Sequence, residues 1–196
     1  MNKVAGFIAA GGRSSRMGTD KAWLEIGGRP MIERVIEAVR PVASTVSVIA
    51  NDSSYARLGL RVFEDTNKGI GPLEAIRTAL ANSSEDRALV VACDLPFVTA
   101  ELFEFLIAKS GLHQAIVPVG EDGKIETLCG VYARDALECV TDLIERGERM
   151  VRVLFAEVST CLVPFNDLKH LSGSEHFFEN VNSRSDYLKV RDLTEG

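Results

Sequence analysis

The sequence has few of the residues that build metal centres or disulfide scaffolds. It contains three histidines and four cysteines, and the cysteines lie far apart, without any C-x-x-C pair, at Cys93, Cys129, Cys139 and Cys161. This spacing gives no zinc-binding pattern and no disulfide framework. We therefore expect four free thiols, as is typical of proteins in a reducing cytoplasm.

The sequence also lacks an excess of positive charge and long apolar runs. Its net charge is −6, whereas proteins that bind nucleic acids generally carry a basic face. No run reaches the roughly 18 apolar residues that span a membrane. The apolar run near the N-terminus is too short for a signal peptide. We expect a cytoplasmic protein with neither a nucleic acid nor a membrane as partner.

What is present is typical of a globular protein of moderate size. The 196 residues, 46% hydrophobic and 26% charged, are enough for one domain, 1–196, with a substantial core. Short apolar runs alternate with amphipathic helical stretches. Strands are expected at 4–10, 45–50, 60–64, 88–93, 115–119, 127–133 and 160–163. Helices are expected at 29–42, 72–81, 99–110, 136–145, 150–155 and 183–193.

This alternation predicts an α/β fold with a mostly parallel central sheet. The turn at 120–123 indicates that the strands on either side of it are antiparallel. Thr99 is the expected N-cap of one helix, and Ser183, with Asp186 three residues later, has the pattern of another. In such sheets, ligands bind beyond the carboxyl ends of the strands. The residues from Gly11 onward, Asn51 and Asp94 follow strands and are therefore candidates for a site.

The segment 7–21 predicts a phosphate site. A strand enters two adjacent glycines and then Arg13, Arg16 and Lys21, and glycines let backbone N–H groups approach an anion closely. The spacing fits neither a Walker A loop nor the dinucleotide fingerprint. The alternative is a solvated surface loop, which the preceding buried strand and the chain's overall acidity disfavour.

The other candidates each have a simpler structural interpretation. Asp94 ends an apolar strand, and it could cap a turn or bind Mg²⁺ together with substrate phosphates; a phosphate loop on a neighbouring strand favours the metal. The residues alone favour a turn aspartate at Asp65. Asn180 and Asn182 fit a polar ligand or an Asx-turn equally well.

Taken together, these motifs resemble one family. Residues 9–18 with 20–22, and then 27–32, 69–73, 93–97 and 180–182, are similar in content and order to the molybdenum cofactor guanylyltransferase group of nucleotidyltransferases. The resemblance implies a Rossmann-like, GT-A-type sheet with helices on both faces. It further implies GTP and Mo-molybdopterin as substrates, Mg²⁺ as cofactor, and molybdoenzyme maturation proteins as partners.

The resemblance also implies roles for individual residues. Arg13, Lys21 and Asp94 would be catalytic, with Asp94 binding Mg²⁺ and the two cations stabilising the leaving pyrophosphate. The remaining ligand-binding positions would be Ala9, Ala10, Gly11, Gly12, Asn51 and Asp65 for the nucleotide, and Asn180 and Asn182 for the acceptor. Two positions depart from the family pattern, since Ala9 replaces a usual leucine and Glu74 replaces a usual small residue.

Two other functions stay open at this point. A sibling enzyme could use CTP on the same cofactor, or could act on a sugar or alcohol phosphate, with the same loop. A non-catalytic GTP-binding maturation factor would bind nucleotide without releasing pyrophosphate.

Overall fold

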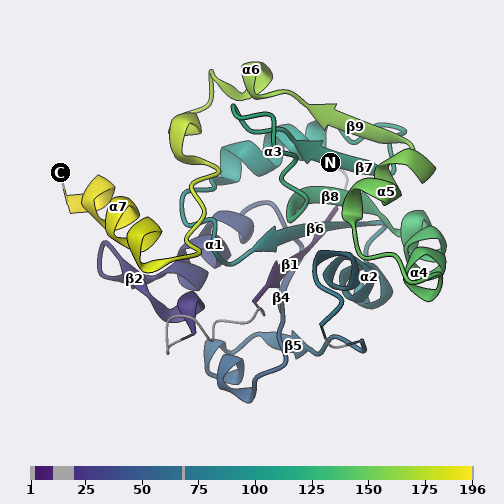
Figure 1. Ribbon diagram of the computed structural model, residues 1–196, viewed down its shortest axis with the longest axis horizontal. Coiled ribbons are helices and arrows are strands. Elements are labelled where there is room, and N and C mark those ends of the chain that lie inside the picture. The colour runs from purple at the N-terminus through teal and green to yellow at the C-terminus, as the bar shows by residue number, and fades with distance from the viewer. Residues whose placement is uncertain (1–2, 11–19, 68, 196) are drawn as a thin grey trace.

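A computed structural model describes residues 3–10, 20–67 and 69–195, and its centre is a seven-stranded sheet (Figure 1). The strand order is β5-β4-β1-β6-β8-β7-β9. The strands are β1 (Ala5–Ala9), β4 (Thr45–Ile49), β5 (Arg61–Phe63), β6 (Arg87–Ala92), β7 (Ala115–Pro118), β8 (Cys129–Ala133) and β9 (Thr160–Val163). Only β8 runs against its neighbours in this sheet. The predicted mostly parallel sheet and the predicted antiparallel pair are both confirmed.

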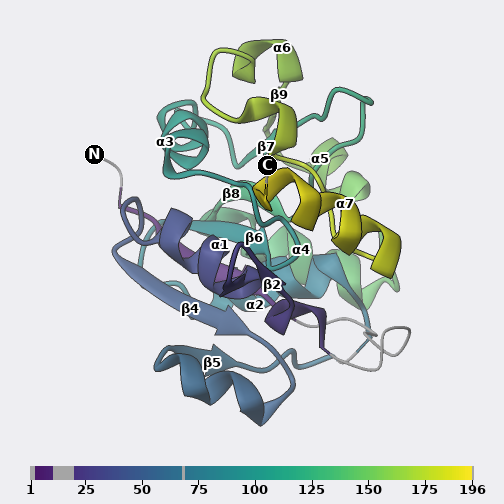
Figure 2. The same ribbon diagram turned by 90° about the vertical axis from the view of Figure 1, so that its left-hand side faces the viewer.

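The central strands are apolar on both faces because helices cover both. The helices are α1 (Met31–Val39), α2 (Pro72–Asn82), α3 (Ala100–Ala108), α4 (Leu137–Glu145), α5 (Val151–Glu157), α6 (Phe165–Leu168) and α7 (Arg184–Glu195). Helices α1 and α3 pack on one face, and α2, α4 and α5 pack on the other (Figures 1 and 2). Burial on both faces explains why β6 reads as an almost unbroken apolar run.

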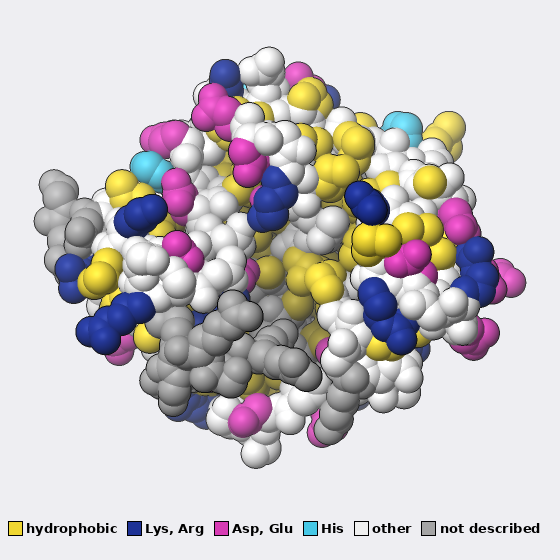
Figure 3. Space-filling model, in the orientation of Figure 1, with side chains coloured by type: hydrophobic (Ala, Val, Ile, Leu, Met, Phe, Trp, Pro, Cys, Tyr) yellow, Lys and Arg dark blue, Asp and Glu magenta, His cyan; other side chains and the backbone are white. Residues whose placement is uncertain are grey.

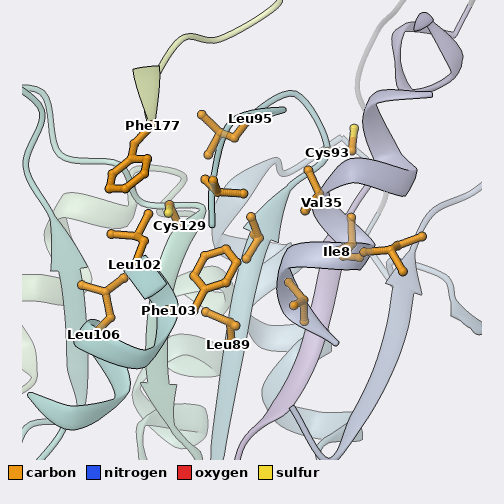
Figure 4. Close-up of a cluster of buried hydrophobic side chains, with 14 of the residues drawn as sticks. Ile8, Val35, Leu89, Cys93, Leu95, Leu102, Phe103, Leu106, Cys129 and Phe177 are labelled. Carbon is orange, nitrogen blue, oxygen red and sulfur yellow. The ribbon is translucent and has the colours of Figure 1, made fainter. Parts of the chain in front are cut away.

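Each face of the sheet has its own hydrophobic core. On the α1 and α3 side, Phe103 and Leu106 lie against Leu89 of β6 and Cys129 of β8 (Figure 4). On the other side, Leu73 and Ile76 of α2 pack with residues of β1, β6 and α4. No helix in the described ranges combines the length and apolar character needed to cross a bilayer.

Two predicted helix caps are confirmed. The Thr99 hydroxyl accepts from the Leu102 backbone N–H at the start of α3. Before α7, the Ser183 hydroxyl accepts from the Asp186 N–H, and the Asp186 carboxylate accepts from the Ser183 N–H. These reciprocal bonds form a capping box, which satisfies backbone donors that a helix start leaves free.

A short hairpin replaces the predicted start of α1. Residues Glu25–Ile26 (β2) pair antiparallel with Arg29–Pro30 (β3), so the helix begins at Met31 rather than at Arg29. Gly27 and Gly28 have φ values of 59° and 75°, which suit a two-residue hairpin turn and are costly for other residues. The glycine pair is the sequence signal that predicts this turn.

The hairpin anchors the C-terminal segment beside the sheet. A small core joins Ile26 and Met31 to Val181 and Val190, and the Tyr187 hydroxyl donates to the Glu25 carbonyl oxygen at 2.9 Å. Helix α7 and β2 lie side by side in both views (Figures 1 and 2). This docking brings residues 180–182, which are far away in sequence, to the edge where β6 ends.

Gly130 gives a stability prediction for the sheet. It lies in β8 between two strands, and a Cβ atom there would come within 2.9 Å of the Ile116 carbonyl oxygen and 2.5 Å of a Val117 methyl. We expect Gly130→Ala to lower the free energy of unfolding by about 1–3 kcal/mol, because a backbone oxygen cannot move aside cheaply. Urea unfolding followed by circular dichroism measures this, and an unchanged midpoint would contradict the packing.

Candidate active site

A cavity of about 140 Å³ lies at the carboxyl ends of the central strands. Its walls come from the ends of β1, β4 and β6 and from the first turn of α2. The lining residues are Ala9, Ala10, Lys21, Ile49, Asp65, Gly71, Pro72, Ala75, Ala92, Cys93, Asp94 and Leu128. The face drawn in Figure 3 is hollowed near its middle, and hydrophobic side chains form its floor. Five predicted site residues thus share one cavity: Ala9, Ala10, Lys21, Asp65 and Asp94.

A lysine–aspartate pair is the main charged feature of the cavity. Lys21 Nζ lies 2.5 Å from Asp94 Oδ2 and 3.0 Å from Asn182 Oδ1. The side chains of Lys21 and Asp94 are 21% and 14% exposed, so the pair is only partly screened by water. Three predicted site residues from distant parts of the sequence therefore meet in one cluster.

The second oxygen of Asp94 has no such partner among the residues that the structure describes. Oδ1 is buried and has no hydrogen bond from any residue that the structure describes. The backbone carbonyl of Asp94 accepts from the Val181 N–H at 3.2 Å, which fixes the 180–182 segment beside it. A buried carboxylate oxygen without a donor is costly. Asp94 Oδ1 is therefore open to a cation or a donor brought by a ligand.

The turn that carries Lys21 is held in place by a tyrosine that the sequence did not predict. Lys21 begins a 3₁₀ turn, Lys21–Trp23, whose N-cap Asp20 accepts from the Ala22 N–H. The other oxygen of Asp20 accepts from the hydroxyl of Tyr55, a buried side chain, at 2.6 Å. Tyr55 follows β4, at the same sheet edge as the other candidates, and an aromatic residue in that polar segment is the signal that could have found it.

Asp65 lies in the cavity wall and is tied to α2. Thr78, which is buried in α2, donates from its hydroxyl to Asp65 Oδ1 at 3.2 Å. Desolvation raises the pKa of Asp65 above its ordinary value, and nearby Glu74 adds to the rise, whereas the Thr78 bond and Arg77 oppose it. The preference for a turn aspartate was incomplete, because this carboxylate faces a cavity as well as a helix.

Glu74 is the unexpected charged residue of this region. Its side chain is fully buried in the first turn of α2. Arg77 donates to both carboxylate oxygens at 2.7 and 2.9 Å, and Asn67 donates from its backbone N–H at 3.1 Å and from its amide at 3.3 Å. Burial alone would raise the pKa of Glu74, but these donors outweigh it and leave the pKa lowered.

Two other predicted residues that the structure describes, Asn51 and Asn180, are not brought into this cluster. Asn51 is exposed after β4 and is not among the described residues that line the cavity. Asn180 donates from its amide to the Phe178 carbonyl oxygen at 3.2 Å, a local contact within its own segment. Gly11, Gly12 and Arg13 lie outside the described residues.

A larger open hollow of about 660 Å³ lies elsewhere, between α1 and the turn that carries Trp23. The Arg57 guanidinium lies 3.2 Å from the centroid of the Trp23 ring and stacks on it. The described residues that line this hollow come from α1, β3 and two 3₁₀ turns rather than from the carboxyl ends of the central strands. The smaller cavity, where those strands end, is therefore the better candidate for chemistry.

Comparison with known proteins decides the family. A family model described as the MobA-like NTP transferase domain matches residues 6–161. The chain belongs to this family. It is 34% identical over 190 residues, 97% of its length, to a probable molybdenum cofactor guanylyltransferase of Carboxydothermus hydrogenoformans, and covers 96% of that protein. It is 32% identical to a molybdenum cofactor guanylyltransferase of Shewanella pealeana, with 92% and 90% of the two chains covered.

Solved structures agree on the fold of this MobA-like nucleotidyltransferase. The molybdopterin-guanine dinucleotide biosynthesis protein A of Archaeoglobus fulgidus superposes with a TM-score of 0.82 at 24% identity, over 98% of this chain and 99% of that one. A 2-C-methyl-D-erythritol 4-phosphate cytidylyltransferase of Thermus thermophilus superposes with a TM-score of 0.73 at 19% identity, over 99% and 100%. The Rossmann-like α/β fold expected from the sequence is confirmed, and so is the family resemblance.

Proposed function

We propose that the protein transfers GMP from GTP to Mo-molybdopterin, forming the guanine dinucleotide cofactor and releasing pyrophosphate. The observation that carries this proposal is the Lys21–Asp94 pair at the carboxyl ends of β1 and β6, with one Asp94 oxygen open to a ligand. The names of the full-length relatives supply the nucleotide and the acceptor.

The residues that line the cavity contact different parts of GTP. Lys21 binds the phosphates of GTP as a mobile point charge, and its place beside Asp94 and Asn182 supports this role. The backbone at Ala9 and Ala10 lines the cavity where β1 ends, and it meets the nucleotide together with Gly11 and Gly12. Asp65 accepts hydrogen bonds from the nucleoside, as its desolvated position in the cavity wall suggests.

The residues present fit a magnesium ion bound together with substrate. Mg²⁺ takes one or two carboxylates and completes its octahedron with phosphate oxygens and water. Asp94 Oδ1 is a buried carboxylate oxygen without a donor from the described chain, as such a ligand would be. Over the same residues, no three His, Cys, Asp or Glu side chains gather to hold a metal by themselves. Bound there, Mg²⁺ would neutralise charge on the triphosphate.

The transfer needs positioning and charge more than a base. An oxygen of the acceptor's terminal phosphate attacks the α-phosphorus of GTP and forms the new P–O bond. The bond from the α-phosphorus to the bridging oxygen breaks, and pyrophosphate leaves with the electron pair. Lys21 and Arg13 stabilise the charge that builds on pyrophosphate. The attacking phosphate is already largely ionised near neutral pH, so it needs no general base.

The acceptor side and the cellular setting complete the proposal. Asn182, already at the Lys21 cluster, and Asn180 face Mo-molybdopterin, while Asn51 contacts the nucleotide from the end of β4. The whole chain, 1–196, acts as one nucleotidyltransferase domain. We place the reaction in the cytoplasm, where GTP is made, and the four free cysteines fit a reducing compartment.

The rival functions are separated by nucleotide preference and by turnover. Because cytidylyltransferases share this fold, the fold does not select the base. We expect GTP with Mg²⁺ to raise the melting temperature more than CTP with Mg²⁺ does, since ligands stabilise the state they bind. A larger shift with CTP would reject guanylyl transfer, and binding of GTP without pyrophosphate release in the presence of Mo-molybdopterin would indicate a non-catalytic factor.

A further inference from the structure

The loop that forms one wall of the cavity is fastened to α2 by a buried carboxylate. Glu74 is 0% exposed, and it accepts four hydrogen bonds, two from Arg77 and two from Asn67. Arg77 neutralises it from its own helix, and Asn67 binds it from the loop with its backbone N–H and its amide. A buried charge is stable only when it is paired and hydrogen-bonded. Buried Glu74 therefore requires its Arg77 and Asn67 partners, whereas an exposed glutamate could be solvated by water.

Two further contacts fasten the same loop. Asp65 accepts from the Thr78 hydroxyl in α2, and Ile70 packs on the core that α2 shares with the sheet. The Ile70 N–H also donates to the Asn67 carbonyl oxygen at 3.4 Å. Glu74 thus holds the middle of a segment whose ends, Asp65 and Gly71, both line the cavity.

The charge of Asp65 changes what the cavity can bind near the start of α2. Helix N-termini attract anions because their free N–H groups carry partial positive charge. At this helix start, Asp65 lines the cavity beside the first turn of α2 and offsets that charge, whereas the Glu74 charge is paired with Arg77. Such a wall suits the hydrogen-bond donors of a base or ribose better than it suits phosphates, which fit the Lys21 side.

We propose that Glu74 is a positioning residue that holds residues 65–67 and 69–71 in place for the nucleoside end of GTP. This rests on the proposed function. Glu74 touches neither substrate nor metal in this scheme and acts through Asn67. Removing its contacts loosens the part of the cavity wall that contains Asp65 and is assigned to the nucleoside. Lys21 and Asp94, which are assigned to the phosphates, stay in place.

The test compares binding of a nucleotide with binding of a bare phosphate chain. The variants are Glu74→Gln and Asn67→Asp. The first removes the charge that pairs with Arg77, and the second places an acid beside Glu74 from an exposed loop position without disturbing the core. For both, we expect KM for GTP to rise about tenfold or more, kcat to fall less than about threefold, and the Ki of inorganic tripolyphosphate to stay unchanged.

Glu157→Gln is the matched control, because Glu157 also pairs with an arginine, Arg146, but at an exposed site on α5. It should leave all three constants unchanged. An unchanged KM in both variants, or a parallel loss of GTP and tripolyphosphate affinity, would overturn the proposal. A wild-type protein that neither binds nor turns over GTP would instead reject the proposed function, so the two failures are distinguishable.

Discussion

Asp94→Asn should lower kcat for the Mg²⁺-dependent turnover of GTP by at least about 10³-fold. The protein should stay as stable as the wild type or become more stable. The asparagine keeps the shape of the side chain but removes the charge that a cation needs. It also removes a buried negative charge, one of whose oxygens lacks a donor among the described residues, and an unsatisfied buried group costs about 1–3 kcal/mol. The amide oxygen of the asparagine can still accept from Lys21. Activity and stability should therefore move apart.

Pyrophosphate release and differential scanning calorimetry measure the two effects on the same preparation. Asp167→Asn is the control, because Asp167 pairs with Lys109 at an exposed site, 3.4 Å away, and exposed pairs contribute little. It should change neither quantity. Full activity in Asp94→Asn would reject the metal assignment, and a large loss of stability would show that Asp94 is chiefly structural.

Lys21→Met should lower kcat/KM by at least about 10²-fold, the usual effect of removing one donor that stabilises developing charge. Its effect on stability should have the opposite sign to that of Asp94→Asn. Without Lys21, Asp94 Oδ2 loses the donor that the described structure gives it, and neither carboxylate oxygen then has one among the described residues. The melting temperature should therefore fall.

A double-mutant cycle tests this coupling. Because Asp94→Asn removes the charge that Lys21→Met leaves unpaired, the double variant should regain the melting temperature of the wild type without regaining activity. Lys109→Met, at the exposed pair with Asp167, serves as the control for loss of a lysine. Additive changes in melting temperature would contradict the pairing of Lys21 with Asp94.

Most of the fold was predictable because its strands and helices have clear periodicity. The apolar run of β6 reflects a strand that is buried on both faces of the sheet. The spacing of apolar residues in α1 reflects a helix that buries one face. The turn at 120–123 was enough to predict that β8 reverses direction. The β2–β3 hairpin was missed because two-residue strands have too few residues to show alternation.

The site was predictable where chemistry follows a strand end, and less so where it depends on packing. Lys21 and Asp94 were found in this way, and they share the cavity with Asp65, for which the residues alone favoured a turn and the family resemblance implied a role at the nucleotide. The sequence assigned no role to Tyr55 or Glu74, because each acts through a hydrogen bond to another segment. Tyr55 bonds to Asp20, and Glu74 bonds to Asn67. Which asparagine reaches Lys21 depends on how α7 docks on the hairpin, and no local pattern encodes that.

The most direct test of guanylyl transfer follows the phosphates of GTP separately. The protein is incubated with Mg²⁺, Mo-molybdopterin and GTP labelled at either the α- or the γ-phosphate. We predict that the α-label enters the cofactor and the γ-label appears in pyrophosphate, one for each transfer. Release of the γ-label as inorganic phosphate, or an α-label that stays in free nucleotide while acceptor is present, would contradict the proposed function.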